Sequence, residues 1–145
     1  MKTIFQFLCS TVCLLATGQA LAGPPVEVTF KNLSAKTVTL QLTNANENST
    51  YLIANPKPEQ KVNAGQSIKF TVQRQVSPDV NGASLRYSDG TKTCAFGTSF
   101  VMMMSGGMML PKWSKAANPS GGATCTAVNS GFGANYSWKA EFVMK

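Results

Sequence analysis

The sequence predicts an all-β protein, an antiparallel β-sandwich of seven to nine strands with one disulfide, which follows a cleaved signal peptide. Three observations support this prediction. Apolar and polar residues alternate with a period of two over much of the chain, turn-like segments separate these runs at short intervals, and no segment has a convincing helical period.

The alternation is clearest in four segments, at residues 26–31, 38–42, 68–72 and 136–144. Each segment predicts a strand with one buried face, and the last one places an aromatic row on that face. Residues 43–50 are polar and predict a loop. Tyr51, Leu52 and Ile53 then predict a short strand that ends before Pro56.

A hairpin is predicted where Asp89 and Gly90 lie between two strand-like runs. These residues favour a two-residue type I′ turn, because both central positions of that turn need a positive φ. In this register Leu85 lies opposite Cys94. The side chain of Cys94 is therefore expected to point into the core.

The first 22 residues have the composition of a secretory leader. Lys2 precedes an apolar stretch at residues 4–16, and Ala20 and Ala22 have the small-x-small spacing of a cleavage site. We therefore expect a secreted or periplasmic protein whose mature chain, residues 23–145, forms one domain. No transmembrane segment is expected in the mature chain, because it contains no sufficiently long apolar run.

Removal of the leader changes the meaning of the four cysteines. Cys9 and Cys13 leave with it, so that only Cys94 and Cys125 remain. In an oxidising compartment two cysteines most simply form one disulfide. The loop that they close would add about 3–4 kcal/mol of stability in the chain-entropy model.

The charge balance favours some partners over others. Without Lys2, 12 basic and 6 acidic side chains remain, a net charge of +6. The basic residues are scattered along the chain rather than clustered with aromatic residues, which argues against nucleic-acid binding. A basic exported protein is better suited to an anionic membrane or envelope surface.

The composition also argues against an enzyme. The chain contains no histidine, which excludes Ser-His-Asp and Cys-His nucleophilic sites and histidine-based zinc sites. Its six acidic residues show no pairing in the sequence, and its glycines follow turn positions rather than a phosphate-binding motif. We expect a protein without catalytic residues and without a resident cofactor.

One segment, residues 100–113, breaks the alternating pattern because both of its faces are apolar. With Gly106 and Gly107 as a hairpin turn, one face holds Phe100, Met102, Met104, Met109 and Trp113, and the other holds Val101, Met103, Met108 and Leu110. Pro111 cannot donate to a strand ladder, so the returning strand is expected at a sheet edge or to be irregular.

Three interpretations of this hairpin are open. Its methionines could fill irregular gaps in the core. It could instead protrude and dock on a membrane or an apolar partner, with Lys112 at headgroup level. The contact residues would then be Phe100, Met102, Met103, Met104, Met108, Met109, Leu110, Lys112 and Trp113. The third interpretation is a Cu(I) site of the thioethers of Met102, Met104 and Met109.

Residues 30–34, 55–56, 62–70 and 82–87 carry a faint resemblance to aegerolysin-like proteins. The resemblance lies in an Asn-rich strand start, a proline, an Ala-Gly-x-Ser run and a glycine before a tyrosine, and it covers roughly the middle half of the mature chain. It implies a small β-sandwich that recognises membrane lipids, in some members together with a pore-forming partner. It assigns no lipid-contact residue at an individual position.

The sequence thus favours an exported, non-catalytic binding module that engages a membrane or envelope partner through the methionine-rich hairpin. Two alternatives are a periplasmic Cu(I)-binding protein and an inhibitor or immunity-type protein that caps an enzyme. The oligomeric state is left open by the sequence.

Overall fold

The computed structural model describes residues 21–145 of the chain. Most of the expected leader, including Cys9 and Cys13, lies outside the described residues. The elements in chain order are β1 (Val26–Asn32), β2 (Val38–Leu40), α1 (Ala45–Ile53), β3 (Lys61–Val62), β4 (Ser67–Val72), β5 (Val80–Ser88), β6 (Thr93–Ser105), β7 (Met108–Ser120), β8 (Cys125–Ser130) and β9 (Trp138–Met144). Within residues 21–145 no helix is long and apolar enough to cross a bilayer.

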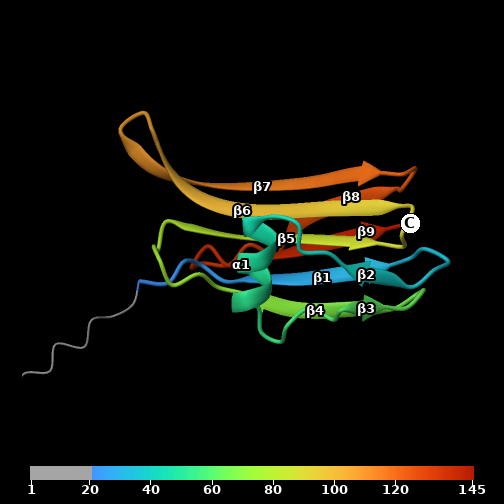
Figure 1. The fold of residues 1–145 in the computed structure, drawn as a ribbon. Coiled ribbons are helices and arrows are strands. Elements are labelled where there is room, and N and C mark those ends of the chain that lie inside the picture. The colour runs from blue at the N-terminus through green and yellow to red at the C-terminus, as the bar shows by residue number, and fades with distance from the viewer. Residues whose placement is uncertain (1–20) are drawn as a thin grey trace, which may run out of the picture.

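The strands form two sheets, which confirms the predicted all-β sandwich (Figure 1). One sheet has the order β4-β1-β9-β8 and the other has the order β3-β2-β5-β6-β7. One pairing departs from the predicted antiparallel arrangement, because β1 and β9 run parallel. A parallel pair needs a long connection rather than a hairpin, and here nearly the whole chain connects its first and last strands.

The core lies between the two sheets and is built from the alternating residues that predicted the strands. In β1, Val26, Val28 and Phe30 are all completely buried. Aromatic rings cross the space between the sheets, as in the stacked pair of Phe30 with Tyr87, whose centroids are 4.3 Å apart. Such pairs contribute about 0.5–1.5 kcal/mol beyond their buried area.

The predicted disulfide is present and joins the two sheets. Cys94 is the second residue of β6 and Cys125 is the first residue of β8, and their Cα atoms are 5.7 Å apart. Cys94 is completely buried, as its predicted inward direction requires. The bond lies near the end of the sandwich where Thr124 and Lys145 exchange backbone hydrogen bonds.

Helix α1 corrects the predicted loop at residues 43–50 and the predicted strand at residues 51–53. Asn44 caps the helix by accepting a hydrogen bond from the backbone of Glu47, and the Glu47 carboxylate accepts hydrogen bonds from the backbone and hydroxyl of Thr43. These reciprocal bonds resemble a capping box. The helix also covers the edge of β5, where the hydroxyl of Thr50 accepts a hydrogen bond from the backbone of Ser84.

The connection between β5 and β6 is longer than predicted. Leu85 lies opposite Phe96 rather than Cys94, and the loop has four residues, 89–92. The Asp89 carboxylate accepts hydrogen bonds from the backbones of Thr91 and Lys92, which stabilises a wider turn. The register shifts by two residues, so every side chain keeps its predicted face.

Candidate functional site

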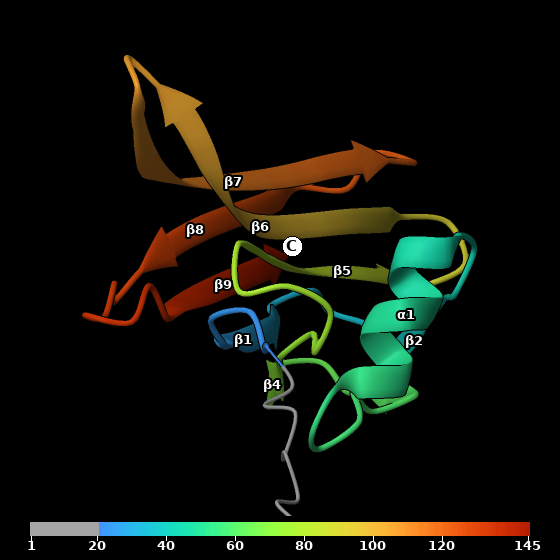
Figure 2. The ribbon, with the colours of Figure 1, turned by 90° about the vertical axis from the view of Figure 1, so that its left-hand side faces the viewer.

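The β6–β7 hairpin projects from one end of the sandwich and curves away from it (Figures 1 and 2). Each of its strands has 13 residues, whereas β5, the neighbour of β6, has nine. Gly106 and Gly107 form the two-residue turn with φ values of 57° and 82°. A turn of this kind needs positive φ at both positions, which glycine adopts without strain.

The register of the hairpin confirms the predicted faces. Met104 lies opposite Met109 on one face, and Met103 lies opposite Leu110 on the other. Strand β7 is the outer strand of its sheet, as Pro111 predicted. Pro111 lies opposite Met102, and this pairing explains how the strand accommodates a proline. The Met102 backbone donates toward Asp79 rather than toward β7, so this pair makes no ladder hydrogen bond that needs a proline N–H.

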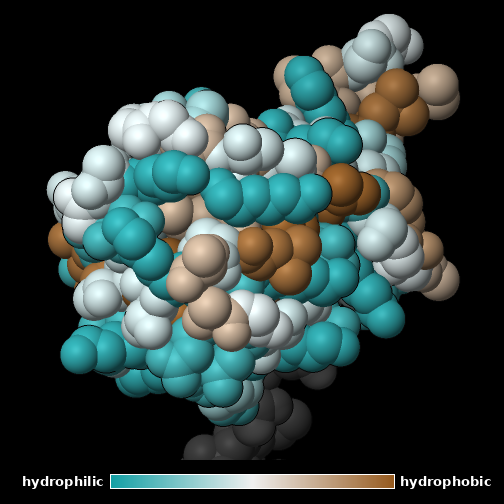
Figure 3. All heavy atoms as spheres, turned by 90° about the vertical axis from the view of Figure 1, so that its right-hand side faces the viewer, coloured by the Kyte–Doolittle hydropathy of each residue, from teal (hydrophilic) through white to brown (hydrophobic). Residues whose placement is uncertain are grey.

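The tip of the hairpin is exposed on both faces. We define the tip as Met103, Met104, Met108, Met109 and Leu110, whose exposed fractions are 45%, 67%, 64%, 46% and 45%. The interpretation of these side chains as core filler is therefore wrong. Figure 3 views the molecule from the side opposite the hairpin, which projects at the upper right. Tan and brown hydrophobic residues occur on this projection, whereas the face toward the viewer is largely polar.

The base of the hairpin belongs to the core, which corrects part of the predicted contact set. Phe100 is completely buried and Met102 is half-buried. Phe100 packs against Trp113 across the hairpin and against Trp138 of the other sheet, with centroid distances of 5.5 and 6.1 Å. Phe100 therefore anchors the hairpin and is not available to a partner.

Two exposed aromatic residues outside the predicted contact set lie beside this base. The Phe132 ring is 4.7 Å from the ring of Trp113, and the Tyr136 ring stacks on Phe100 at 5.4 Å. Phe132 is 54% exposed and Tyr136 is 40% exposed. We call Trp113, Phe132 and Tyr136 the aromatic ledge. Phe132 stands between Gly131 and Gly133, and a large apolar residue in such a loop was the available signal.

The last strand begins two residues later than predicted, at residue 138 rather than 136. Strand β9 begins at Trp138, and Tyr136 precedes it in the left-handed region with a φ of 63°. This conformation is uncommon for a residue with a bulky side chain. It ends the alternating pattern before the strand and turns the ring toward Phe100 rather than into the row of β9.

Two cations follow the tip on β7. Lys112 and Lys115 are exposed and form no ion pair with any other residue in the described part of the chain. Other basic residues lie elsewhere: Lys36 approaches Asp89 at the opposite end of the sandwich, and Lys31 pairs with Glu141. The hairpin therefore carries only some of the basic side chains of the protein.

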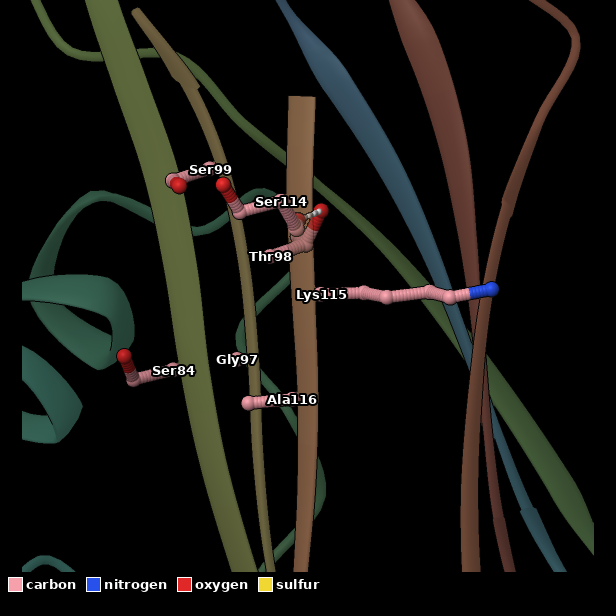
Figure 4. Close-up of a pocket in the computed structure, with 7 residues that line it drawn as sticks. All are labelled: Ser84, Gly97, Thr98, Ser99, Ser114, Lys115 and Ala116. Carbon is pink, nitrogen blue, oxygen red and sulfur yellow. Dashed lines mark hydrogen bonds between the residues drawn. The ribbon is translucent and has the colours of Figure 1, made fainter. Parts of the chain in front are cut away.

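The outer face of β5, β6 and β7 carries a shallow pocket (Figure 4). It is lined by Ser84, Gly97, Thr98, Ser99, Ser114, Lys115 and Ala116. Figure 4 shows Ser84 and Ala116 pointing to the side of α1 and Lys115 extending away from it. The Thr98 hydroxyl is already engaged by Trp138 and Asn129. The pocket offers hydroxyl groups but no carboxylate or aromatic ring, and it brings none of the tip residues together.

Glu47, the most buried carboxylate near that face, has a structural role. Burial raises its pKa, but the two Thr43 hydrogen bonds and the Arg86 guanidinium, 2.8 Å away, outweigh burial and hold the pKa below its ordinary value. Glu47 is therefore ionised at neutral pH and ties α1 to β5. Residues 21–145 contain no group of three histidine, cysteine or acidic side chains that could hold a metal ion.

Comparison with known proteins adds no relationship: the chain matches no family model, and no curated protein is significantly similar to it.

Proposed function

We propose that the protein is an exported, non-catalytic module that binds anionic membrane surfaces by inserting the tip of the β6–β7 hairpin. The exposure of five apolar side chains on both faces of a projecting hairpin carries this proposal. The Cys94–Cys125 disulfide supports an oxidising compartment, and the resemblance to lipid-recognising aegerolysin-like proteins agrees with the proposed partner.

The shape of the tip favours lipid over a protein groove. A groove would cover the tip mainly from one side, whereas Met104 and Met103 expose opposite faces of the same strand. A bilayer is fluid and closes around a projection from all directions. The exposed fractions of the tip amount to between two and three complete side chains, which would contribute about 5 kcal/mol on insertion. This is comparable to a single acyl chain, so binding would be reversible and would depend on charge.

The dimensions of the hairpin agree with interfacial insertion. The three residue pairs from Met103–Leu110 to Ser105–Met108 span about 7–10 Å along the strands. Amphipathic interfacial elements are buried about 5–10 Å into the boundary of headgroups and acyl chains. Lys112 lies two residues beyond Leu110, where its ammonium group would meet lipid phosphates. The aromatic ledge follows at the level that tyrosine and tryptophan prefer at membrane interfaces.

Flotation with lipid vesicles tests the proposal. The mature protein, residues 23–145, is mixed with vesicles of phosphatidylcholine and phosphatidylglycerol and with vesicles of phosphatidylcholine alone. We expect it to float with the anionic vesicles and more weakly with the neutral ones. The variant Met103→Ser with Met108→Ser removes exposed apolar surface equal to about one side chain, so its partition coefficient should fall by about 30-fold.

The matched control is Leu33→Ser with Leu52→Ser. These leucines are 52% and 72% exposed and lie away from the hairpin, after β1 and in α1. The control should float like the wild type. Flotation of the folded tip variant at wild-type level, with circular dichroism unchanged, would exclude the hairpin from the mechanism, and an absence of wild-type flotation would refute the proposal.

A second candidate function is Cu(I) binding, which the register of the hairpin favours. Met104 and Met109 lie directly opposite each other, and Met102 is the next residue on the same face. Three thioethers within reach of one ion suit a soft monovalent metal. Native mass spectrometry under anaerobic conditions tests this candidate. The expected result is one Cu(I) adduct that Met109→Leu removes, and a protein without an adduct would eliminate the candidate.

A further inference from the structure

We propose that the four methionines of the hairpin tip form an oxidation site at which peroxide releases the protein from lipid. This inference rests on the proposed membrane function and adds its regulation. The four residues are Met103, Met104, Met108 and Met109, next to the turn at Gly106 and Gly107. A tip built of leucine would bury similar apolar surface, so thioethers add a reactivity that membrane binding itself does not need.

The exposure of the methionines divides them into reactive and protected groups. The four tip methionines are 45–67% exposed, whereas Met102 is half-buried and Met144 is completely buried in the core. Oxidation of methionine requires contact between the sulfur and an oxidant in solution. Met144 therefore serves as an internal control within the same chain.

The reaction needs no catalytic group. A sulfur lone pair attacks one oxygen of hydrogen peroxide, the O–O bond breaks, and an S–O bond forms. The sulfur is oxidised by two electrons to the sulfoxide, and the peroxide is reduced to water after solvent protons are redistributed. The thioether thereby becomes a strongly polar group. Sulfoxide reductases can reverse the change with a dithiol as the two-electron reductant, which releases the oxygen as water.

Oxidation should change lipid affinity and leave the fold intact. The tip side chains lie outside the core cluster, which includes Met102 only as a partly buried neighbour. The hairpin backbone is held by its ladder and its glycine turn, which do not depend on the sulfur atoms. Insertion of the oxidised tip would bury sulfoxide oxygens without hydrogen-bond partners, which is unfavourable in an apolar phase.

The experiment combines peroxide treatment with vesicle flotation. The mature protein is oxidised with hydrogen peroxide, and peptide mass spectrometry follows each methionine. We expect oxygen addition at the four tip positions before Met144, an unchanged circular dichroism spectrum, and a partition coefficient at least about tenfold lower. Treatment with methionine sulfoxide reductases A and B should restore flotation.

A leucine variant separates the effect of the tip from oxidation elsewhere. In this variant Met103, Met104, Met108 and Met109 are all replaced by leucine, which preserves the apolar tip. Its partition coefficient is measured before and after peroxide treatment, and the treated value should equal the variant's own untreated value. Loss of the variant's flotation after treatment would overturn the inference. Undiminished flotation of the oxidised wild type would also overturn it, but would leave the proposed function standing. A wild type that does not float before peroxide treatment overturns both the inference and the proposed function.

Discussion

Loss of the Cys94–Cys125 disulfide is expected to lower the free energy of unfolding by about 4 kcal/mol and to leave membrane binding intact. The two cysteines are 31 residues apart in the sequence. For a closed loop of this length the chain-entropy relation gives about 3.7 kcal/mol at 25 °C, because the cross-link restricts the unfolded chain. The bond also joins β6 to β8 and therefore one sheet to the other.

Two perturbations separate the cross-link from the packing of the sulfur atoms. Chemical reduction breaks the bond and keeps both sulfur atoms in place. The variant Cys94→Ala with Cys125→Ala also removes the sulfur of the completely buried Cys94, and the small cavity should add about 1 kcal/mol to the loss. We therefore expect the alanine variant to be less stable than the reduced wild type.

Urea unfolding followed by circular dichroism measures the effect. With a denaturant dependence of about 1.5–2 kcal/mol per molar urea for a domain of this size, the midpoint of the reduced protein should fall by about 2 M. Vesicle flotation in the same buffer without urea should be unchanged, because the disulfide lies at the end of the sandwich opposite the hairpin tip. If reduction lowers the free energy of unfolding by less than about 1 kcal/mol, the loop-entropy argument is refuted. If the reduced protein no longer floats, the disulfide end of the sandwich and the hairpin tip are not independent.

Two further predictions concern Glu47 and Phe132. The pKa of Glu47 lies below its ordinary value, so its ionised form stabilises the folded state above the unfolded pKa of about 4.5, and this contribution is lost as the pH falls through the folded pKa. Glu47→Gln should cost about 3 kcal/mol at pH 7 because Arg86 loses its partner, and it should flatten the decline in stability below about pH 5. Thermal unfolding from pH 2 to 7 measures both effects, and parallel curves for wild type and variant would contradict them. Phe132→Ser should lower the partition coefficient for anionic vesicles about fivefold, since Phe132 is 54% exposed. Flotation equal to that of the wild type would remove the aromatic ledge from the mechanism.

Much of the fold could be predicted because several strands alternate clearly between buried and less buried residues. In β1 every apolar residue is buried and every intervening residue is less buried, as a period of two requires. The disulfide could be predicted because the expected cleavage of the leader would leave only Cys94 and Cys125, and because the alternation directs Cys94 inward. Both predictions depend on local pattern and composition alone.

Helix α1 could not be predicted in the same way. Its sequence is polar and has no clear helical period. Asn44 and Glu47 cap it locally, but the bonds that hold it against β5 join residues distant in the chain. Glu47 pairs with Arg86 across 39 residues, and Thr50 bonds to Ser84 across 34. The wider turn at Asp89 has a local cause instead: the Asp89 carboxylate caps two backbone groups and so overrides the preference of an Asp-Gly pair for a tight turn.

The hairpin has some properties that follow from local sequence and others that arise only when the chain folds. The sequence determined the turn at Gly106 and Gly107 and the two apolar faces, because positive φ and the period of two are local properties of the backbone. The exposure of Met103 and Met108 was decided by the tertiary structure. A strand face is buried only if another element covers it, and β6 and β7 extend past their neighbours. The aromatic ledge likewise exists only because folding brings Phe132 against Trp113.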